Sequence, residues 1–535
     1  MTIGHGFNKV CYITAQTLSV NTSRCSFYNP ASFHVAVSML KNLSGLVQHS
    51  RSYSVRNMEK FITDKYYVNG KWQSARATFP VLNPFNGENV GQAADCSRQD
   101  TENAVKCAKD AFKSWKNTCA KQRAAIFRRW YELMIENKHS LAQLITVENG
   151  KPLQESIGEV NYAASFLEWC AEESKRTYGI TIPTTSQNKR MMTVKQPIGV
   201  AGMITPWNFP IAMITRKACA AIAAGCTVVL KPAEDTPFSA VAIAKLAEEA
   251  KLPDGVLNIL PCSREKAPEV GEVISQHPDV MALSFTGSTA TGKILLKQAS
   301  GTVKKVAMEL GGLAPFIVFN SADINKAVMN TMISKFRYMG QTCVCPNRIY
   351  VQEKIYDEYV QVLARAVKKD LKIGNPMDSG ISFGPLINEK AILKVEDQVQ
   401  DAIKKGGKLV MGGSRGEGGV YLPTIITDVN LDMKCCHEET FGPLAPIIKF
   451  ETEEEVLAMA NNTRSGLAGY FFSNDVAQCW RVAEQLEVGM VGINEGMVST
   501  CEAPFGGVKE SGLGRESSCY ALDEFMEVKY MCWNV

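Results

Sequence analysis

Three residues have the side-chain types needed for covalent chemistry at a carbonyl group. Cys343 ends the segment Gly340–Cys343 after a predicted helix, and a thiolate is the best common nucleophile once its pKa is lowered. Glu309 ends a predicted strand among apolar residues, where desolvation raises a carboxyl pKa toward that of a general base. Asn208 lies in Pro206–Pro210 and can direct its amide at a developing oxyanion.

Each of the three also has a purely structural interpretation. A cysteine is usually a small buried hydrophobe, a glutamate at a strand end can cap a turn, and Asn208 can form an Asx turn. The His and Asn of a cysteine protease are not evident near Cys343, which weakens a hydrolase interpretation. The assignment therefore needs support from other segments.

Two loops after predicted strands are candidates for binding a dinucleotide. Phe285–Gly292 opens a predicted helix, whose free N–H groups and dipole favour a phosphate. Lys231–Glu234 offers a cation and a carboxylate where ribose hydroxyls could bind. The fingerprint G-x-G-x-x-G after a strand, with an acid about twenty residues later, is missing, so a standard Rossmann assignment fails. Alone, each loop is more often an ordinary turn.

The elements that must position these groups follow from hydrophobic periodicity. Helical patterns cover Asp100–Trp115 and Arg123–Met134. Short apolar runs then alternate with a helical pattern, which predicts βαβ units and a parallel sheet; these segments are Val228–Leu230, Ser239–Ala250, Gly255–Leu260 and Met281–Phe285. The alternation restarts after Gly312 with the strand Ala314–Phe319, the helix Ala322–Tyr338 opened by Ser321, the strand Arg348–Val351 and the helix Tyr356–Leu371. The sequence predicts two α/β sheets, with ligands beyond the carboxyl ends of the first.

Composition excludes several other classes. A chain of 535 residues with 45% apolar and 21% charged residues is globular and has two to four domains. The longest apolar stretch, Cys219–Leu230, is too short to cross a bilayer. The 17 cysteines are scattered without C-x-x-C pairs, which fits a reducing compartment. Beyond residue 57, only His139, His277 and His437 are histidines and none has metal-ligand spacing, so we expect no metal.

Residues 1–57 have the composition of a mitochondrial transit peptide. They contain five basic residues and no acid, are rich in Ser, Thr and Asn, and are followed by the first acid, Glu59. A cleavage near Arg51–Arg56 and a location in the mitochondrial matrix follow, while a merely disordered tail is the alternative. The remaining chain has 53 basic and 54 acidic residues and no basic patch, so a nucleic-acid partner is not expected.

Together, these segments resemble the aldehyde dehydrogenase superfamily over about Tyr67–Lys529. The likeness is carried, in that family's order and spacing, by Pro206–Pro210, Lys231–Glu234, Phe285–Ser288, Glu309–Gly312, Gly340–Cys343 and Glu438–Pro443. It implies an α/β fold with a modified Rossmann domain for NAD at 58–178 and 200–308 and an α/β catalytic domain at 309–498. A small β oligomerisation arm would be formed by 179–199 and 499–535.

The resemblance also implies roles for single residues. Cys343 attacks the aldehyde, the Asn208 amide and the Cys343 N–H hold the oxyanion, and Glu309 activates the water that hydrolyses the thioester. The implied cofactor residues are Arg216, Lys231, Pro232, Ala233, Glu234, Gly287, Ser288, Thr289, Ala290, Thr291, Gly292, Glu439 and Phe441. A carboxylate at Glu234 repels a 2′-phosphate, so we expect NAD rather than NADP, although a nearby Lys could weaken that repulsion.

Within the superfamily, Leu313, Cys343–Cys345 and Glu487–Gly496 resemble the succinate-semialdehyde dehydrogenases of 4-aminobutyrate degradation. That branch implies substrate carboxylate binding by Arg216, Arg337 and Ser499, or by the adjacent Thr500, and a redox disulfide between Cys343 and Cys345. The alternatives are a dehydrogenase for glutarate semialdehyde, a betaine-type or a medium-chain aldehyde, a thioester hydrolase or acyl transferase, and a non-catalytic protein with the same fold.

The chain end is predicted to assemble subunits. Glu524–Met531 alternates like a strand that could pair across subunits, with a partner hairpin near Met191–Gln196. By resemblance we expect a homotetramer with a small aldehyde as its ligand, and a dimer is the alternative. The sequence predicts no membrane partner.

Overall fold

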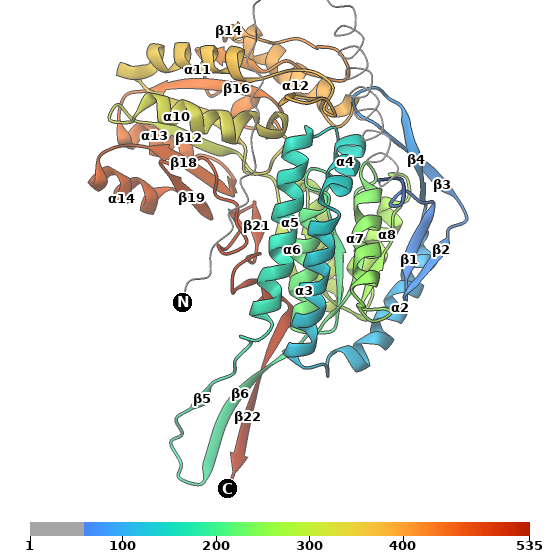
Figure 1. Ribbon diagram of the computed structural model, residues 1–535. Coiled ribbons are helices and arrows are strands. Elements are labelled where there is room, and N and C mark those ends of the chain that lie inside the picture. Colours follow the sequence, from blue (N-terminus) through green and yellow to red (C-terminus); the bar gives the residue numbers. More distant parts are fainter. Residues whose placement is uncertain (1–57) are drawn as a thin grey trace, which may run out of the picture. The chain divides into compact units, whose positions relative to one another are not determined.

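Two sheets carry most of the chain in the computed structural model, which describes residues 58–535 (Figure 1). The predicted leader at 1–57 lies outside the described residues. The first sheet has the order β2-β1-β9-β8-β7-β10-β11-β21. Its five central strands run parallel; they are β7 (Val200–Ile204), β8 (Thr227–Lys231), β9 (Leu257–Ile259), β10 (Val280–Thr286) and β11 (Lys305–Glu309). The antiparallel edges are β1 (Lys65–Val68), β2 (Lys71–Ser74) and β21 (Gly512–Leu513).

Helices cover both faces of this sheet, because each strand is apolar on both sides. In β8, Val228 and Leu230 belong to one core cluster and Val229 belongs to another. One face is covered by α3 (Ala120–Glu136), α4 (Lys138–Asn149), α5 (Leu153–Glu173), α6 (Ala212–Ala224) and α7 (Pro237–Glu249). The other is covered by α2 (Arg98–Trp115), α8 (Ala267–Gln276) and α9 (Thr289–Ala299).

The second sheet has the order β14-β15-β16-β13-β12-β18-β19 and is parallel except for its first strand. Its strands are β12 (Ala314–Val318), β13 (Pro346–Gln352), β14 (Lys408–Met411), β15 (Thr424–Thr427), β16 (Leu444–Phe450), β18 (Ala468–Phe472) and β19 (Met490–Ile493). Its helices are α10 (Ile324–Thr331), α11 (Tyr356–Asp370), α12 (Glu389–Lys404), α13 (Glu453–Asn461) and α14 (Val476–Gln485). A separate core cluster lies within this layer.

A third, three-stranded sheet extends away from α3 and α5 (Figure 1). In it, β6 (Lys189–Pro197) pairs on one side with β5 (Thr181–Ile182) and on the other with β22 (Met526–Asn534), antiparallel in both cases. Two short pairs complete the strands: β3 (Thr78–Leu82) with β4 (Asn89–Ala94), and β17 (Ser465–Gly466) with β20 (Val508–Lys509). The predicted C-terminal strand therefore pairs with the predicted hairpin within one chain. The domain boundaries stay a prediction.

The predicted helix Ala322–Tyr338 is the one element that the structure changes substantially. The helix begins at Ile324 with Asp323, not Ser321, as its N-cap, and its α-helical part ends at Thr331. A π-helical turn, Met332–Phe336, and a 3-10 turn, Arg337–Gly340, follow. Tyr338 and Met339 have positive φ angles of 46° and 52°, which no hydrophobic pattern reveals. The chain thus turns sharply just before Cys343.

The other predicted elements differ from the observed ones mainly at their ends. The helix predicted from Asp100 begins at Arg98, because Ser97 and Asp100 form a capping box. The short strand predicted over Gly255–Leu260 is reduced to β9. None of the helices within residues 58–535 has the length and apolar character needed to cross a membrane.

Candidate active site

The site lies where the two large sheets face each other. At the carboxyl ends of parallel strands in the first sheet stand Ile204, Lys231, Thr286 and Glu309, the last residues of β7, β8, β10 and β11. Cys343 lies just before β13 and Phe441 just before β16, at the amino ends of strands in the second sheet. The first sheet therefore supplies one wall and the second sheet supplies the cysteine.

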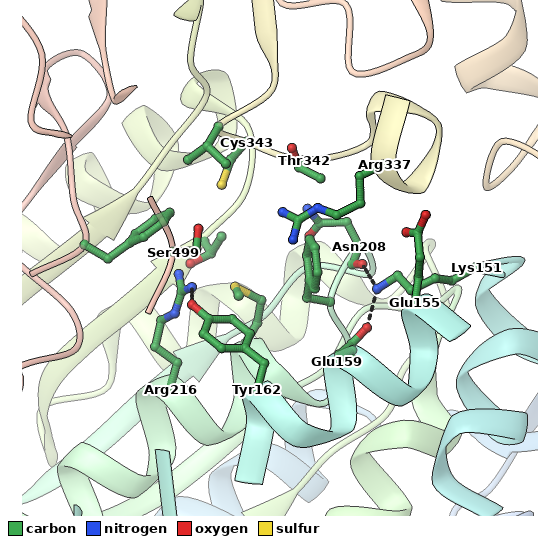
Figure 2. Close-up of a pocket in the computed structure, with 16 residues that line it drawn as sticks. Lys151, Glu155, Glu159, Tyr162, Asn208, Arg216, Arg337, Thr342, Cys343 and Ser499 are labelled. Carbon is green, nitrogen blue, oxygen red and sulfur yellow. Dashed lines mark hydrogen bonds and ion pairs between the residues drawn. The ribbon is translucent and has the colours of Figure 1, made fainter. Parts of the chain in front are cut away.

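Cys343 borders two cavities. One, of about 260 Å³, is also lined by Asn208, Arg216, Arg337 and Ser499, and the Cys343 sulfur points toward the space between these side chains (Figure 2). The other, of about 470 Å³, is also lined by Asn208 and by Gly287, Ser288, Glu439 and Phe441. Two molecules, one bound in each cavity, would therefore meet at Cys343.

Asn208 is held so that its amide can act beside this thiol. Its Nδ2 donates to the carbonyl of Gln341 at 3.1 Å, which leaves the second N–H of the amide without a partner among residues 58–535. The backbone carbonyl of Asn208 accepts a hydrogen bond from Lys151 Nζ at 2.8 Å. Lys151 forms a buried ion pair with Glu159, whose Oε1 accepts the Ile211 N–H at 3.0 Å. Asn208 is therefore fixed from both sides, as an oxyanion donor must be.

Glu309 is buried at the end of β11, and its Oε2 has no hydrogen-bond partner in the described part of the chain. This excludes the turn-capping alternative for that oxygen. Burial raises the pKa of the Glu309 carboxyl, and repulsion by Glu516 raises it further, whereas Arg216 and Lys217 oppose the rise. Such a carboxyl can accept a proton near neutral pH, in agreement with the expected base.

Lys217 and Glu516 are charged residues near Glu309 that the motif analysis missed. The Lys217 ammonium contacts Glu516 and donates to Ser284 Oγ at 3.1 Å, and Arg216 Nη1 lies 3.7 Å from Glu516 Oε2. The available signal was the adjacent pair Arg216 and Lys217 in the apolar helix α6, since buried cations need a counter-charge. Arg216 is itself buried, so its contact with Glu516 is not a surface salt bridge.

The thiol pKa differs from the expectation. Cys343 is partly accessible from the cavities yet enclosed by protein, and this burial, together with the Glu309 charge, raises the pKa of its thiol to about 12, while Arg216 lowers it. Without ligands the thiol is therefore protonated at neutral pH. Attack on a carbonyl then requires that a neighbouring group accept the thiol proton.

The two arginines of the smaller cavity have different surroundings. Arg216 donates to the Tyr162 hydroxyl, and its guanidinium carbon lies 4.1 Å from the centre of the Phe505 ring. Arg337 donates from Nη1 to the sulfur of Met497 at 3.1 Å, its Nε is buried without a partner, and no carboxylate of the described residues lies within ion-pair distance. Arg337 thus has no ion-pair partner among residues 58–535, although the Glu155 carboxylate lines the same cavity and the Arg337 charge lowers its pKa against the rise caused by burial.

Ser499, rather than Thr500, lines the cavity beside these arginines. The Thr500 hydroxyl instead donates to the Glu502 carboxylate. Of these two residues, Ser499 is therefore the one placed to contact a ligand in this cavity, and its role in binding stays a prediction.

The residues expected to bind the cofactor lie in several places, and Arg216 lines the smaller cavity rather than the larger one. Gly287, Ser288, Glu439 and Phe441 line the larger cavity. Lys231 ends β8 and Glu234 follows it, and Glu234 lines a neighbouring cavity with Arg264, a residue that also lines the larger cavity. Pro232 and Ala233 form the buried turn between them, whereas Thr289, Ala290, Thr291 and Gly292 form the first turn of α9 and line neither cavity that Cys343 borders.

In that first turn, Ser288 is the N-cap and accepts the Thr291 N–H at 3.3 Å. A side chain at Gly292 would place its Cβ 2.4 Å from the Leu310 side chain, so that glycine is needed for packing. On the opposite wall, Glu439 Oε1 accepts the Gly312 N–H at 3.1 Å. The hydroxyls of Thr286 and Thr440, which both line the larger cavity, are buried without partners, so the cavity offers free polar groups to a ligand.

No group of three or more His, Cys, Asp or Glu side chains suited to a metal ion occurs within residues 58–535. Cys343 and Cys345 are both free thiols. Cys345 is buried, and its sulfur lies 3.4 Å from the ammonium of Lys335, a contact made possible by the π-helical turn that contains Lys335.

Comparison with known proteins agrees with this geometry. Residues 72–531 match the model of the aldehyde dehydrogenase family, and the chain belongs to that family. It is 58% identical to the mitochondrial succinate-semialdehyde dehydrogenase of Mus musculus, over 87% of this chain and 90% of the mouse protein. The protein is therefore an enzyme that oxidises aldehydes with a nicotinamide cofactor, and the hydrolase and non-catalytic alternatives are not supported.

Solved structures of the family superimpose closely. A succinate-semialdehyde dehydrogenase from Burkholderia pseudomallei has a TM-score of 0.87 and 51% identity, covering 89% of this chain and 99% of that one. An NADP-dependent enzyme from E. coli has a TM-score of 0.88 and 49% identity, with the same two coverages. The expected fold, a modified Rossmann cofactor domain beside an α/β catalytic domain, is confirmed at the level of the family.

The Glu516→Gln variant is predicted to lower the pH at which Glu309 ionises. Glu516 raises the pKa of Glu309 by repulsion, so removing its charge lowers that pKa, and the unpaired Lys217 acts in the same direction. In the pH profile of thioester hydrolysis, the limb that rises as Glu309 loses its proton should move by about one unit toward lower pH.

The same variant leaves a buried cation unpaired and should lose about 3–5 kcal/mol of stability, so rates must be measured well below its unfolding temperature. Glu527→Gln, on the exposed strand β22, is the matched control and should leave the profile in place. A shift of the rising limb to higher pH would contradict the assignment of that limb to Glu309.

Proposed function

We propose that this enzyme oxidises succinate semialdehyde to succinate with NAD. The observation that carries the proposal is Arg337, a cation without an ion-pair partner among the described residues, at a small cavity whose other polar groups include Cys343, Ser499 and Glu155. A short aldehyde with a distal carboxylate can contact Cys343 with its aldehyde group and Arg337 with its carboxylate. Guanidinium groups bind carboxylates in a bidentate manner. The similarity to the mouse enzyme supports the same substrate.

The residues around the larger cavity fit a dinucleotide. The exposed first turn of α9, with Ser288 and Thr289, suits a pyrophosphate, and Glu439 and Phe441 suit the nicotinamide ribose. Lys231 and Glu234 suit the adenosine ribose, which would place Pro232 and Ala233 beneath it. When bound, the cofactor supplies an acceptor for the hydride that leaves the substrate carbon.

The chain's own groups account for the remaining chemistry. The Cys343 thiol gives its proton to a neighbouring base as its sulfur adds to the aldehyde carbon, and a thiohemiacetal forms. The Asn208 amide N–H and the Cys343 N–H stabilise the oxyanion. After oxidation to the thioester, Glu309 takes a proton from a water molecule, which displaces the Cys343 thiolate and releases the acid.

Selectivity for NAD rests on Glu234. Its carboxylate accepts hydrogen bonds from ribose hydroxyls and repels a 2′-phosphate. Arg264 Nε lies 3.0 Å from Glu234 Oε1 and Lys231 Nζ lies 3.5 Å from Oε2, so two cations reduce that repulsion. We infer a preference for NAD that is finite, rather than exclusion of NADP.

Assembly and location are proposals of the same kind. Val528, Tyr530 and Trp533 on β22 are more than half exposed, which suits a partner subunit and supports the proposed homotetramer. Light scattering would distinguish a tetramer from a dimer.

The basic, acid-free residues 1–57 support import into the mitochondrial matrix. The N-terminus of the imported protein would show the cleavage site.

The Arg337→Ala variant is predicted to lose the preference for succinate semialdehyde. Removing the guanidinium should lower kcat/KM for this substrate about 100-fold, the size expected for a charge-assisted bidentate contact. The rate with hexanal should change less than about threefold, because no carboxylate is recognised. Formation of reduced cofactor at 340 nm measures both.

Glutarate semialdehyde serves as the chain-length control in this comparison. Equal rates of the wild-type protein with succinate semialdehyde and hexanal would refute the substrate assignment but leave the aldehyde dehydrogenase. A higher kcat/KM with glutarate semialdehyde would shift the assignment to the longer substrate.

The Glu234→Gln variant is predicted to accept NADP better. Removing the negative charge frees Arg264 and Lys231 to attract a 2′-phosphate, so kcat/KM for NADP should rise about tenfold or more. Glu249→Gln, an exposed change on α7, is the control. An unchanged ratio of NADP to NAD efficiency would show that Glu234 does not face the 2′ position.

Cys343 and Cys345 are proposed to form a reversible disulfide. Two cysteines so close in sequence give a strained ring that reductants open easily. Burial raises the pKa of the Cys345 thiol, and the Lys335 ammonium 3.4 Å away partly offsets that rise. Peroxide should abolish activity, and dithiothreitol should restore it. In the Cys345→Ser variant, peroxide should also lower the activity, but dithiothreitol should restore less of that activity than in the wild type. Equal recovery in both proteins would argue against this disulfide.

A further inference from the structure

The partner that Arg337 has in the unliganded site is a thioether. Its Nη1 donates to the sulfur of Met497 at 3.1 Å, and Met497 lies two residues before Ser499 in the loop that borders the cavity. The Met497 side chain is 37% exposed. The loop is fixed at this point, because the Met497 N–H donates to Glu495 Oε1 at 2.8 Å.

A thioether is a weak hydrogen-bond acceptor without charge. It keeps the guanidinium in place but competes poorly with a carboxylate for the same N–H groups. Met497 therefore lets Arg337 exchange its protein partner for the substrate at little energetic penalty. A stronger acceptor at the same position would hold Arg337 and weaken substrate binding.

Oxidation converts Met497 into such an acceptor. Hydrogen peroxide transfers one oxygen atom to the thioether sulfur, which is oxidised to the sulfoxide, while the peroxide is reduced to one molecule of water. The sulfoxide oxygen carries partial negative charge and accepts a charge-assisted hydrogen bond from the guanidinium. We propose that Met497 is an oxidation site that weakens recognition of the substrate's carboxylate by engaging Arg337.

The other exposed methionines do not contact an arginine of the substrate cavity. Met281, Met329 and Met531 are 42%, 56% and 38% exposed, and none of them accepts a hydrogen bond from a cationic side chain within residues 58–535. Met213 lines the same cavity but is buried. Met497 alone among these five combines accessibility with a hydrogen bond from a substrate-facing arginine.

The first experiment replaces the sulfur without any oxidant. Met497→Gln puts a strong neutral acceptor in place of the thioether, and Met497→Leu removes the acceptor at similar volume. The KM for succinate semialdehyde should rise about five- to tenfold in Met497→Gln, the range for one hydrogen bond to a charged group. In Met497→Leu it should fall slightly. The KM for hexanal should not be higher in Met497→Gln than in Met497→Leu. Equal KM values for succinate semialdehyde in the two variants would overturn the proposal.

The second experiment oxidises the protein itself. Wild-type enzyme is treated with peroxide and then with dithiothreitol, which restores disulfides and sulfenic acids but not methionine sulfoxide. The KM for succinate semialdehyde should stay raised, mass spectrometry should show one added oxygen on the Met497 peptide, and methionine sulfoxide reductases should reverse both. Met329→Leu should respond like the wild type, whereas Met497→Leu should not respond. Oxygen on Met497 with an unchanged KM would refute the coupling.

This inference rests on the proposed function, and the two can fail separately. If Arg337→Ala leaves the selectivity for succinate semialdehyde unchanged, the proposed carboxylate binding by Arg337 fails. If that variant loses selectivity while the Met497 variants and the oxidised enzyme behave like the wild type, only the role of Met497 fails.

Discussion

The site depends on the burial of two adjacent cations. Arg216 and Lys217 lie on α6 within an apolar core, and charged groups remain there only when an opposite charge accompanies them. Glu516 supplies that charge from a segment 299 residues away from Lys217. The same segment adds β21 to the first sheet, where Gly512 lies opposite Glu309. The ion pair thus joins α6 to the segment that pairs with the strand carrying Glu309. Burial is the main cause of the raised pKa of Glu309, and the charges of Glu516, Arg216 and Lys217 modify it.

The arrangement of the two sheets explains why one cysteine can serve two ligands. Parallel strands of the first sheet end at the site, and strands of the second sheet begin there, so loops from both converge. Cys343 and Asn208 line both cavities. Because burial raises the pKa of the Cys343 thiol, its attack on a substrate carbonyl needs a neighbouring group that accepts the thiol proton.

Sequence periodicity predicted the elements where burial alone decides conformation. Strands such as β8 and β10 are apolar on both faces, and Glu309 at the end of β11 was recognised by its apolar neighbours. Periodicity failed at Ala322–Tyr338, because the π-helical turn and the positive φ angles of Tyr338 and Met339 depend on tertiary contacts. It also missed Glu516, since nothing local identifies the partner of a buried cation so distant in sequence. The arginines themselves were found only through resemblance to a family.

The differing partners of the two arginines give the cavity its specificity. The charge of Arg216 is compensated by Glu516 at 3.7 Å, and its guanidinium donates to the Tyr162 hydroxyl. A carboxylate that bound to Arg216 would therefore gain little additional interaction free energy. Arg337 has the Met497 sulfur as its one hydrogen-bond acceptor among the described residues, and its buried Nε is unsatisfied. Under the proposed function, a substrate carboxylate would gain most of its interaction free energy at Arg337, because that contact would satisfy an unpaired guanidinium. Arg216 instead provides a fixed positive field near Cys343, where it favours the oxyanion and the thiolate over their protonated forms. The cavity thus separates recognition of the distal carboxylate from stabilisation of charge at the reacting carbon.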